Sequence, residues 1–124
     1  MSRYLLIQNY EGGVCDQPMG TWEPADVKAH IDFQLTLNAE LTASGELVDA
    51  QGVAAEAQRV TSDGVARTID AGPFAQPLLA GFRIVDVESP ERALEIAARS
   101  SAAPGPAGVP MQLPIEVREV MVAP

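Results

Sequence analysis

Two segments with helical spacing, each opened by a proline, divide this sequence into three strand-forming regions. The first spans residues 24–44 and is followed by Gly45, and the second spans residues 90–100 and follows Ser89, which can cap it. Proline suits the first turn of a helix because its missing N–H would have no partner there. Strands and helices therefore alternate as β, α, a run of β, α and β, which restricts the chain to an α+β fold.

The first predicted helix has an apolar stripe that also carries polar side chains. The members of this stripe are Val27, Ile31, Gln34, Leu35, Asn38 and Leu41, with His30, Phe33 and Leu37 beside them. The second helix carries Ala93, Leu94, Ala97 and Ala98 at helical spacing. We expect both helices to lie on a sheet by these faces, the second one closely because its side chains are small.

Several short segments have the composition of strands. They are residues 3–9, 46–54, 57–61, 65–70, 81–87 and 115–122. Asp63-Gly64 predicts a tight reversal after the third, because this pair readily adopts the positive φ angles of hairpin turns. The prolines within residues 104–110 predict an irregular loop. Residues 1–124 are thus expected to form a single ferredoxin-like α+β domain, an antiparallel sheet with two helices on one face.

Charge and cysteine content exclude several kinds of partner. The net charge of −9 opposes binding to phosphate backbones and to anionic membrane surfaces. No apolar stretch approaches the roughly 20 residues that span a bilayer. We therefore expect a cytoplasmic protein without direct nucleic-acid or membrane contacts. No cofactor motif occurs, and one histidine with one cysteine, Cys15, offers no clustered set of metal ligands.

The predicted sheet has apolar residues on both of its faces. The alternating sets are Phe82 and Ile84 against Val85 and Val87, and Ile115 and Val117 against Val120 and Val122. Two helices cover only one face, so the other needs a partner rather than water. We expect a homodimer that packs sheet to sheet, with valines and isoleucines of these two strands in the interface.

Short segments in a fixed order resemble the YCII-related family, whose hallmark is an Asp-Gly-Pro-Phe sequence. In this chain they are RYLLI at residues 3–7, MGTWEP at 19–24, AHI at 29–31, GELVD at 45–49, AGPF at 71–74, GF at 81–82 and ERALE at 91–95. The resemblance implies a dimeric α+β barrel with a pocket between helix and sheet, in which a histidine and an aspartate meet. Family members also occur beside, or fused to, extracytoplasmic-function sigma factors, which implies a functional link to such a factor.

The family has no settled activity, so two function classes are carried forward. The first is a dimeric module that binds a small ligand or a regulatory partner. The alternative is a small-molecule enzyme that uses His30 as a general acid or base with an acidic partner. We favour the module, because the family's aspartate position is occupied by Ala71 and the acid is one residue earlier, at Asp70. A one-residue slip in a strand turns the carboxylate to the opposite face unless a bulge intervenes.

His30 is the only histidine, and histidine is the side chain best suited to proton exchange near neutral pH. Its place on the helix stripe predicts that it lines a pocket between the first helix and the sheet. Asp49 is the first candidate for its acidic neighbour and Asp70 the second, although Asp70 before a Gly-Pro turn equally fits a turn or capping role. A core histidine hydrogen-bonded to backbone fits the same facts.

Three further residues complete the predicted site. Phe74 would form an apolar wall and Trp22 would lie at the rim, although a tryptophan near a helix start also commonly packs back on that helix. Arg83 lies inside the most apolar strand, where a cation must reach solvent, pair with an acid or face a ligand. Pairing with an acid is the default expectation for it.

Overall fold

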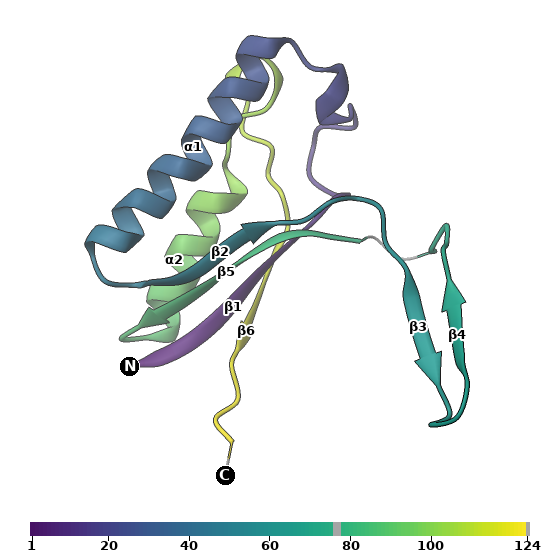
Figure 1. The fold of residues 1–124 in the computed structure, drawn as a ribbon. Coiled ribbons are helices and arrows are strands. Elements are labelled where there is room, and N and C mark those ends of the chain that lie inside the picture. The colour runs from purple at the N-terminus through teal and green to yellow at the C-terminus, as the bar shows by residue number, and fades with distance from the viewer. Residues whose placement is uncertain (76–77, 124) are drawn as a thin grey trace.

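Figure 1 shows a four-stranded antiparallel sheet with two helices on one face, in a computed structural model that describes residues 1–75 and 78–123. The strands are β1 (Ser2–Asn9), β2 (Leu47–Gly52), β5 (Leu79–Val87) and β6 (Ile115–Glu119). Their order across the sheet is β2-β5-β1-β6, and each neighbouring pair is antiparallel. Helix α1 links β1 to β2 and helix α2 links β5 to β6. This is the ferredoxin-like α+β arrangement, so the predicted fold class is confirmed.

Helix α1 (Pro24–Ala43) begins and ends close to the predicted residues. Gly45, the second residue after its end, has a φ of +78°, which lets the chain turn back into β2. The buried residues are His30, Leu37 and Leu41. Ile31 and Leu35 remain 46% and 60% exposed, so this part of the predicted stripe is wrong. The polar residues of the stripe, Gln34 and Asn38, instead lie toward β5, so the buried face of the helix includes them.

Helix α2 (Pro90–Ser101) has the predicted cap, because the Arg92 N–H donates to Ser89 Oγ at 3.2 Å. Its buried residues are Ala93, Ile96, Ala97 and Ser100, whereas Leu94 and Ala98 are exposed, contrary to the prediction for those two. The main core lies between the helices and the sheet. It is formed by Tyr4, Leu6, Leu37, Leu41, Val85, Val87, Ala93, Ile96 and Ala97.

Strand β6 is shorter than predicted. Tyr4 of β1 pairs with Glu119, and the Val120 N–H donates to the Arg3 carbonyl oxygen as the last contact. The strand ends at Glu119, although β1 extends two residues further, to Ser2. Val122 lies beyond the sheet and is 92% exposed.

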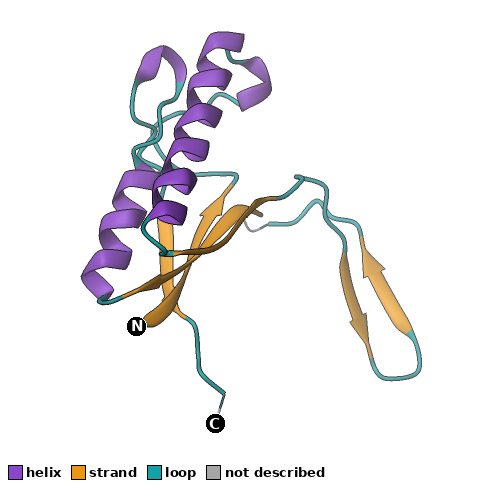
Figure 2. Cartoon of the chain, turned by 60° about the vertical axis from the view of Figure 1, so that its left-hand side comes forward, coloured by secondary structure: helices purple, strands orange, loops and turns teal. Residues whose placement is uncertain are grey.

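A second, two-stranded sheet projects from the body of the domain (Figure 2). It consists of β3 (Arg59–Ser62) and β4 (Arg67–Asp70), joined by the predicted reversal, in which Asp63 Oδ1 accepts from the N–H groups of Val65 and Ala66 at 2.9 Å. Every residue of both strands is exposed. We refer to this hairpin, residues 59–70, as the arm.

The remaining segments are short turns and loops. The 3-10 turns η1 (Met19–Thr21) and η2 (Pro106–Gly108) lie before α1 and after α2. Within the irregular segment that contains η2, Pro104 and Pro110 form an isolated antiparallel bridge. Among the described residues, no helix is both long and apolar enough to cross a membrane.

Candidate functional site

A cavity of about 210 Å³ lies between α1 and the strands β1, β2 and β5; we call it the inner cavity. Its polar lining residues are Gln8, His30, Gln34, Asn38, Gln51, Arg83 and Ser100. Strand pleating explains their convergence, because alternate residues of β5 face the helices. Arg83 therefore shares its face with the buried Val85 and Val87, at the point where α1 carries polar residues.

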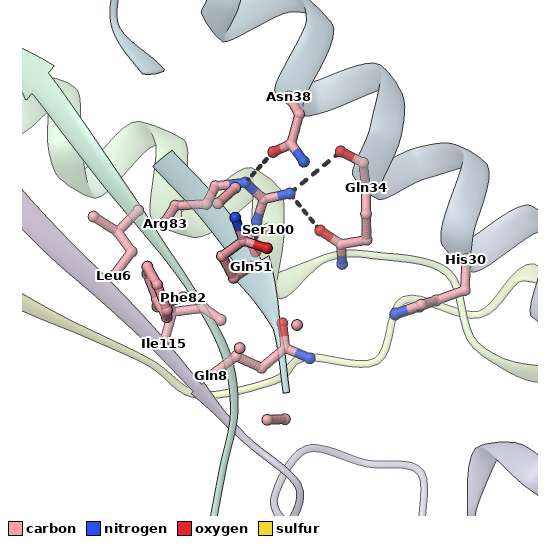
Figure 3. A pocket seen from close by; sticks show the side chains of 14 residues that line it. Leu6, Gln8, His30, Gln34, Asn38, Gln51, Phe82, Arg83, Ser100 and Ile115 are labelled. Carbon is pink, nitrogen blue, oxygen red and sulfur yellow. Dashed lines mark hydrogen bonds between the residues drawn. The ribbon is translucent and has the colours of Figure 1, made fainter. Parts of the chain in front are cut away.

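The Arg83 side chain is held by neutral oxygen atoms from both helices. Its Nε donates to Asn38 Oδ1 at 2.8 Å, and its Nη1 donates to Ser100 Oγ at 2.9 Å. Its Nη2 donates to the side-chain oxygen of Gln34 at 2.5 Å and to the backbone oxygen of that residue at 3.4 Å. Figure 3 shows these side chains pointing toward one another across the cavity. Since a guanidinium has five N–H donors, these bonds leave one on Nη1 for a further acceptor.

No ion pair compensates the charge of Arg83 within residues 1–75 and 78–123. The ion pairs found there are Lys28–Asp32, Arg92–Glu46, Arg92–Glu95 and Arg99–Glu40. Arg83 is nevertheless only 8% exposed. Burial lowers the pKa of its guanidinium, since desolvation disfavours the charged form. The default expectation of an acidic partner is therefore wrong, and the cavity contains a buried cation with neutral partners.

His30 lies one helical turn before Gln34 and is 5% exposed. Its Nδ1 lies 3.0 Å from the carbonyl oxygen of Pro104. Because a carbonyl oxygen can only accept, Nδ1 carries the proton of this bond and Nε2 is the ring nitrogen available to a ligand. His30 thus lines the cavity as predicted, and it also makes the backbone hydrogen bond of the alternative, structural interpretation.

A larger cavity of about 990 Å³ lies beside the first, under the loop that connects β1 to α1; we call it the outer cavity. Trp22, Met111 and Leu113 form a buried apolar cluster in its wall. Trp22 is stacked edge to face on His30, with ring centroids 5.7 Å apart, and its Nε1 donates to the Gln17 carbonyl oxygen at 3.0 Å. The predicted rim residue is therefore a wall residue of the outer cavity.

Asp49 does not face His30. It pairs with Ile84, on the face of the sheet opposite the helices, and its Oδ1 accepts from the Ala50 N–H and from Gln51 Nε2 at 2.9 and 3.1 Å. The register of β2 shifts between Leu47 and Asp49. This bulge turns Asp49 away from the face on which Leu47 packs, so the predicted pairing with His30 is not formed.

Asp70 and Phe74 lie away from both cavities. Asp70 ends β4 in the arm, where its Oδ1 accepts from the Gly72 N–H at 2.9 Å, so the turn interpretation describes its contacts. Phe74 stacks under Arg59, whose guanidinium carbon lies 3.9 Å from the ring centroid. The arm projects from the body of the domain (Figure 2), and neither Asp70 nor Phe74 lines a cavity that His30 lines.

Sequence reasoning missed the polar residues that surround Arg83. Gln34 and Asn38 interrupt an apolar stripe at a spacing of one helical turn, and this interruption is the sequence feature that could have indicated a polar site. Ser100, at the end of the second helix, has no such feature around it.

Within residues 1–75 and 78–123, no group of three or more histidine, cysteine or acidic residues comes together in a way that could hold a metal ion. The arrangement is instead suited to binding a small anion beside an apolar group. Comparisons of the sequence with protein-family models and with curated proteins find no match for this chain.

Proposed function

We propose that this protein is a dimeric module, related to the YCII family it resembles, that binds a small organic anion in the inner cavity through Arg83. The observation that carries the proposal is a guanidinium, 8% exposed, that is surrounded by neutral oxygen atoms. A buried charge is costly unless an opposite charge accompanies it. An anionic ligand would supply that charge and accept the remaining Nη1 proton.

The neutral partners support binding rather than a purely structural role. Asn38, Ser100 and Gln34 fix the plane of the guanidinium without neutralising it. A guanidinium held in this way directs its remaining Nη1 proton at a ligand, because little side-chain entropy remains to be lost. Gln8, which has the same strand parity as the buried Leu6, also lines the cavity and can donate an amide proton to the same ligand.

An enzyme that uses His30 as a general base is the alternative. Its support is the available Nε2 of a ring whose orientation is fixed through Nδ1. However, the oxygen that orients the ring belongs to the Pro104 backbone and carries no charge, and none of the described residues that line the inner cavity is acidic. An imidazolium formed during proton transfer would therefore lack the acidic partner that the family's site implies, which favours the binding module.

The open face of the sheet supports the dimer. Leu5, Ile7, Phe82 and Ile84 lie on it in adjacent cross-strand pairs and remain half-buried. Asp86 lies on the same face, and its Oδ1 is buried without a hydrogen-bond partner among the described residues. A second copy would cover these apolar side chains. It would also bring its own basic groups, such as Arg3 and Arg118 of this face, toward acidic groups such as Asp86.

The arm also favours a second copy of the chain as the partner of this face. A lone two-stranded hairpin is marginally stable in water, and the cross-strand pair Val60 and Ile69 is 58% and 46% exposed. The arm projects from the ends of β2 and β5, beside the open face. We infer that it packs along a second copy of the chain.

Calorimetric titration tests the anion site directly. Sodium propionate is titrated into the wild-type protein, with propionamide as the neutral probe of the same shape. We expect saturable binding of propionate alone, because a charge-assisted hydrogen bond is worth about 1.5–3 kcal/mol. In Arg83→Gln the affinity should fall about tenfold or more, while Arg99→Gln, which changes an exposed arginine of α2, should bind as the wild type does.

Equal binding of propionate and propionamide, or an unchanged affinity in a folded Arg83→Gln protein, would refute the anion site. Arg83→Lys is the second variant, since it keeps the charge in case the glutamine variant does not fold. It should bind propionate more weakly than the wild type because an ammonium lacks the planar set of donors by which Asn38, Ser100 and Gln34 fix the guanidinium.

A further inference from the structure

The inner and outer cavities adjoin. Gln8, His30, Gly52 and Ala80 line both of them. These residues come from β1, α1 and the facing ends of β2 and β5, so the junction lies beside the His30 ring. A ligand whose charged group lies at Arg83 can therefore extend past His30 into the larger space.

The outer cavity is built to take an apolar group. Its buried wall is Trp22, Met111 and Leu113, and Tyr10, Met19 and Val53 also line it while remaining 48%, 39% and 42% exposed. Apolar side chains that converge on a cavity and stay this exposed are left uncovered by the described part of the chain. Covering them with an alkyl or aromatic group removes apolar surface from water, which is favourable.

Charges define the orientation of such a ligand. Among the described residues that line either cavity, Arg83 is the only arginine or lysine, and it lies at the inner end. Glu11 and Asp16 line the outer cavity and repel an anionic group there. The acid group is thus favoured at the inner end and disfavoured at the outer end, where only an uncharged tail fits.

We propose that the ligand is an organic monoacid with an apolar tail, whose carboxylate binds Arg83 in the inner cavity and whose tail passes His30 into the outer cavity beside Trp22. This inference rests on the proposed anion site and adds the ligand class to it. The cavity volumes of about 210 and 990 Å³ accommodate a small head and a much larger tail.

Gly52 offers a way to close the passage between the two cavities. It has the same strand parity as Ala50, which lines the inner cavity, so a side chain at position 52 points toward the helices. The nearest atom to a Cβ at this position is the Ala80 carbonyl oxygen at 4.0 Å. Leucine at position 52 would therefore occupy the junction without a backbone clash.

A chain-length series tests the tail. Propionate, butyrate, hexanoate and octanoate are titrated below their aggregation concentrations, with 1-octanol as the probe that has a tail but no charge. Burial of each methylene contributes about 0.8 kcal/mol, so the Kd should fall about fourfold per methylene while the tail stays within the outer cavity. In Gly52→Leu the gain with length should be lost, so that octanoate binds no more tightly than propionate, whereas Ala98→Leu, on the exposed face of α2, should keep the wild-type series.

The outcomes separate the two proposals. Propionate binding without any gain in affinity from propionate to octanoate would leave the anion site standing and overturn the tail. If a folded Gly52→Leu protein still gains as much affinity from propionate to octanoate as the wild type, the proposed path of the tail past His30 is overturned. Failure of every acid to bind, or equal binding of 1-octanol and octanoate, would overturn the anion site and the ligand class together.

Trp22, the only tryptophan, supplies an independent readout. Octanoate should shift its emission to shorter wavelength, because the tail displaces water from the indole, and propionate should leave the emission unchanged. The shift should be absent in Gly52→Leu. An equal shift with both acids would show that the tail does not reach Trp22 and would contradict the inference.

Discussion

The Nδ1 atom of His30 lies 3.0 Å from the carbonyl oxygen of Pro104, a residue 74 positions away in the chain. The bond ties α1 to the irregular segment that follows α2. Backbone hydrogen bonds also hold that segment together internally, among them the Gly105 N–H to Val109 oxygen bond at 2.8 Å. His30 is therefore a structural tie between two elements as well as a lining residue of both cavities.

His30→Ala should lower the free energy of unfolding by about 1–3 kcal/mol, since it leaves the Pro104 oxygen without its donor. Urea unfolding measures the change. Ile31→Ala is the matched control, because Ile31 is the next residue of the helix and is 46% exposed. The control should stay within about 0.5 kcal/mol of the wild type. Similar losses in both variants would show that the bond to Pro104 contributes little.

Gly81→Ala should destabilise the protein by about 1–3 kcal/mol through overpacking. A Cβ at position 81 would lie 2.9 Å from the Gln51 carbonyl oxygen, inside the ladder between β2 and β5. Gly52→Ala, at the paired position on β2, has 4.0 Å of clearance and should fold as well as the wild type. Thermal unfolding of the two variants, compared side by side, decides the matter; equal midpoints would contradict the expected clash.

The Glu46 carboxylate should contribute to the loss of stability in acid. Bidentate hydrogen bonds from Arg92, at 2.8 and 2.9 Å, are the main cause that lowers its pKa to about 2. The unfolded chain, with a value near 4.5, therefore binds this proton first as the pH falls. The stabilisation is complete above pH 4.5 and is lost progressively as the pH falls to about 2.

Glu46→Gln should accordingly be less stable than the wild type at neutral pH, and the difference should shrink as the pH falls from 4.5 to 2. Urea unfolding across this range gives the difference at each pH. Asp32→Asn is the control, because its pair with Lys28 is exposed and contributes little at any pH. A difference between Glu46→Gln and wild type that stays constant with pH would show that the Arg92 pair does not produce it.

The fold could be predicted from local signals because those signals lie in the chain itself. Ser89 caps α2, and Gly45 ends α1 with its positive φ, as the residue types indicate. Which face of α1 is buried could not be predicted in full, because it depends on a cation from β5, Arg83, that draws Gln34 and Asn38 inward. That contact joins residues more than forty positions apart.

The candidate site was predictable in part for a related reason. The positions of His30 and Arg83 follow from helix and strand periodicity. The failure at Asp49 follows from one bulge in β2, since a single extra residue reverses every later side chain of a strand. The failure at Asp70 follows from the arm, whose strands have ordinary strand composition but form a separate sheet that is not hydrogen-bonded to the main one in the described part of the chain. The valines expected in the dimer interface, Val85 and Val87, are fully buried within the chain instead.

Ile84→Lys should convert the proposed homodimer into a monomer. Ile84 pairs with Leu5 at the centre of the open sheet face, where a second copy would bury it, and an unpaired lysine there cannot be desolvated cheaply. Light scattering on the purified proteins measures the mass. Leu35→Lys is the control, because it adds the same charge to α1 at a side chain that is 60% exposed, away from the open face.

Hydrogen exchange of the arm supplies a second measurement on the same two proteins. If a second copy covers it, its backbone amides should exchange hydrogen slowly in the wild type and quickly in Ile84→Lys, whereas amides of β5 should stay protected in both. A wild-type protein that is monomeric without aggregation would refute the proposed dimer. A dimer that survives Ile84→Lys, with an arm that exchanges quickly, would place the interface somewhere other than the open face.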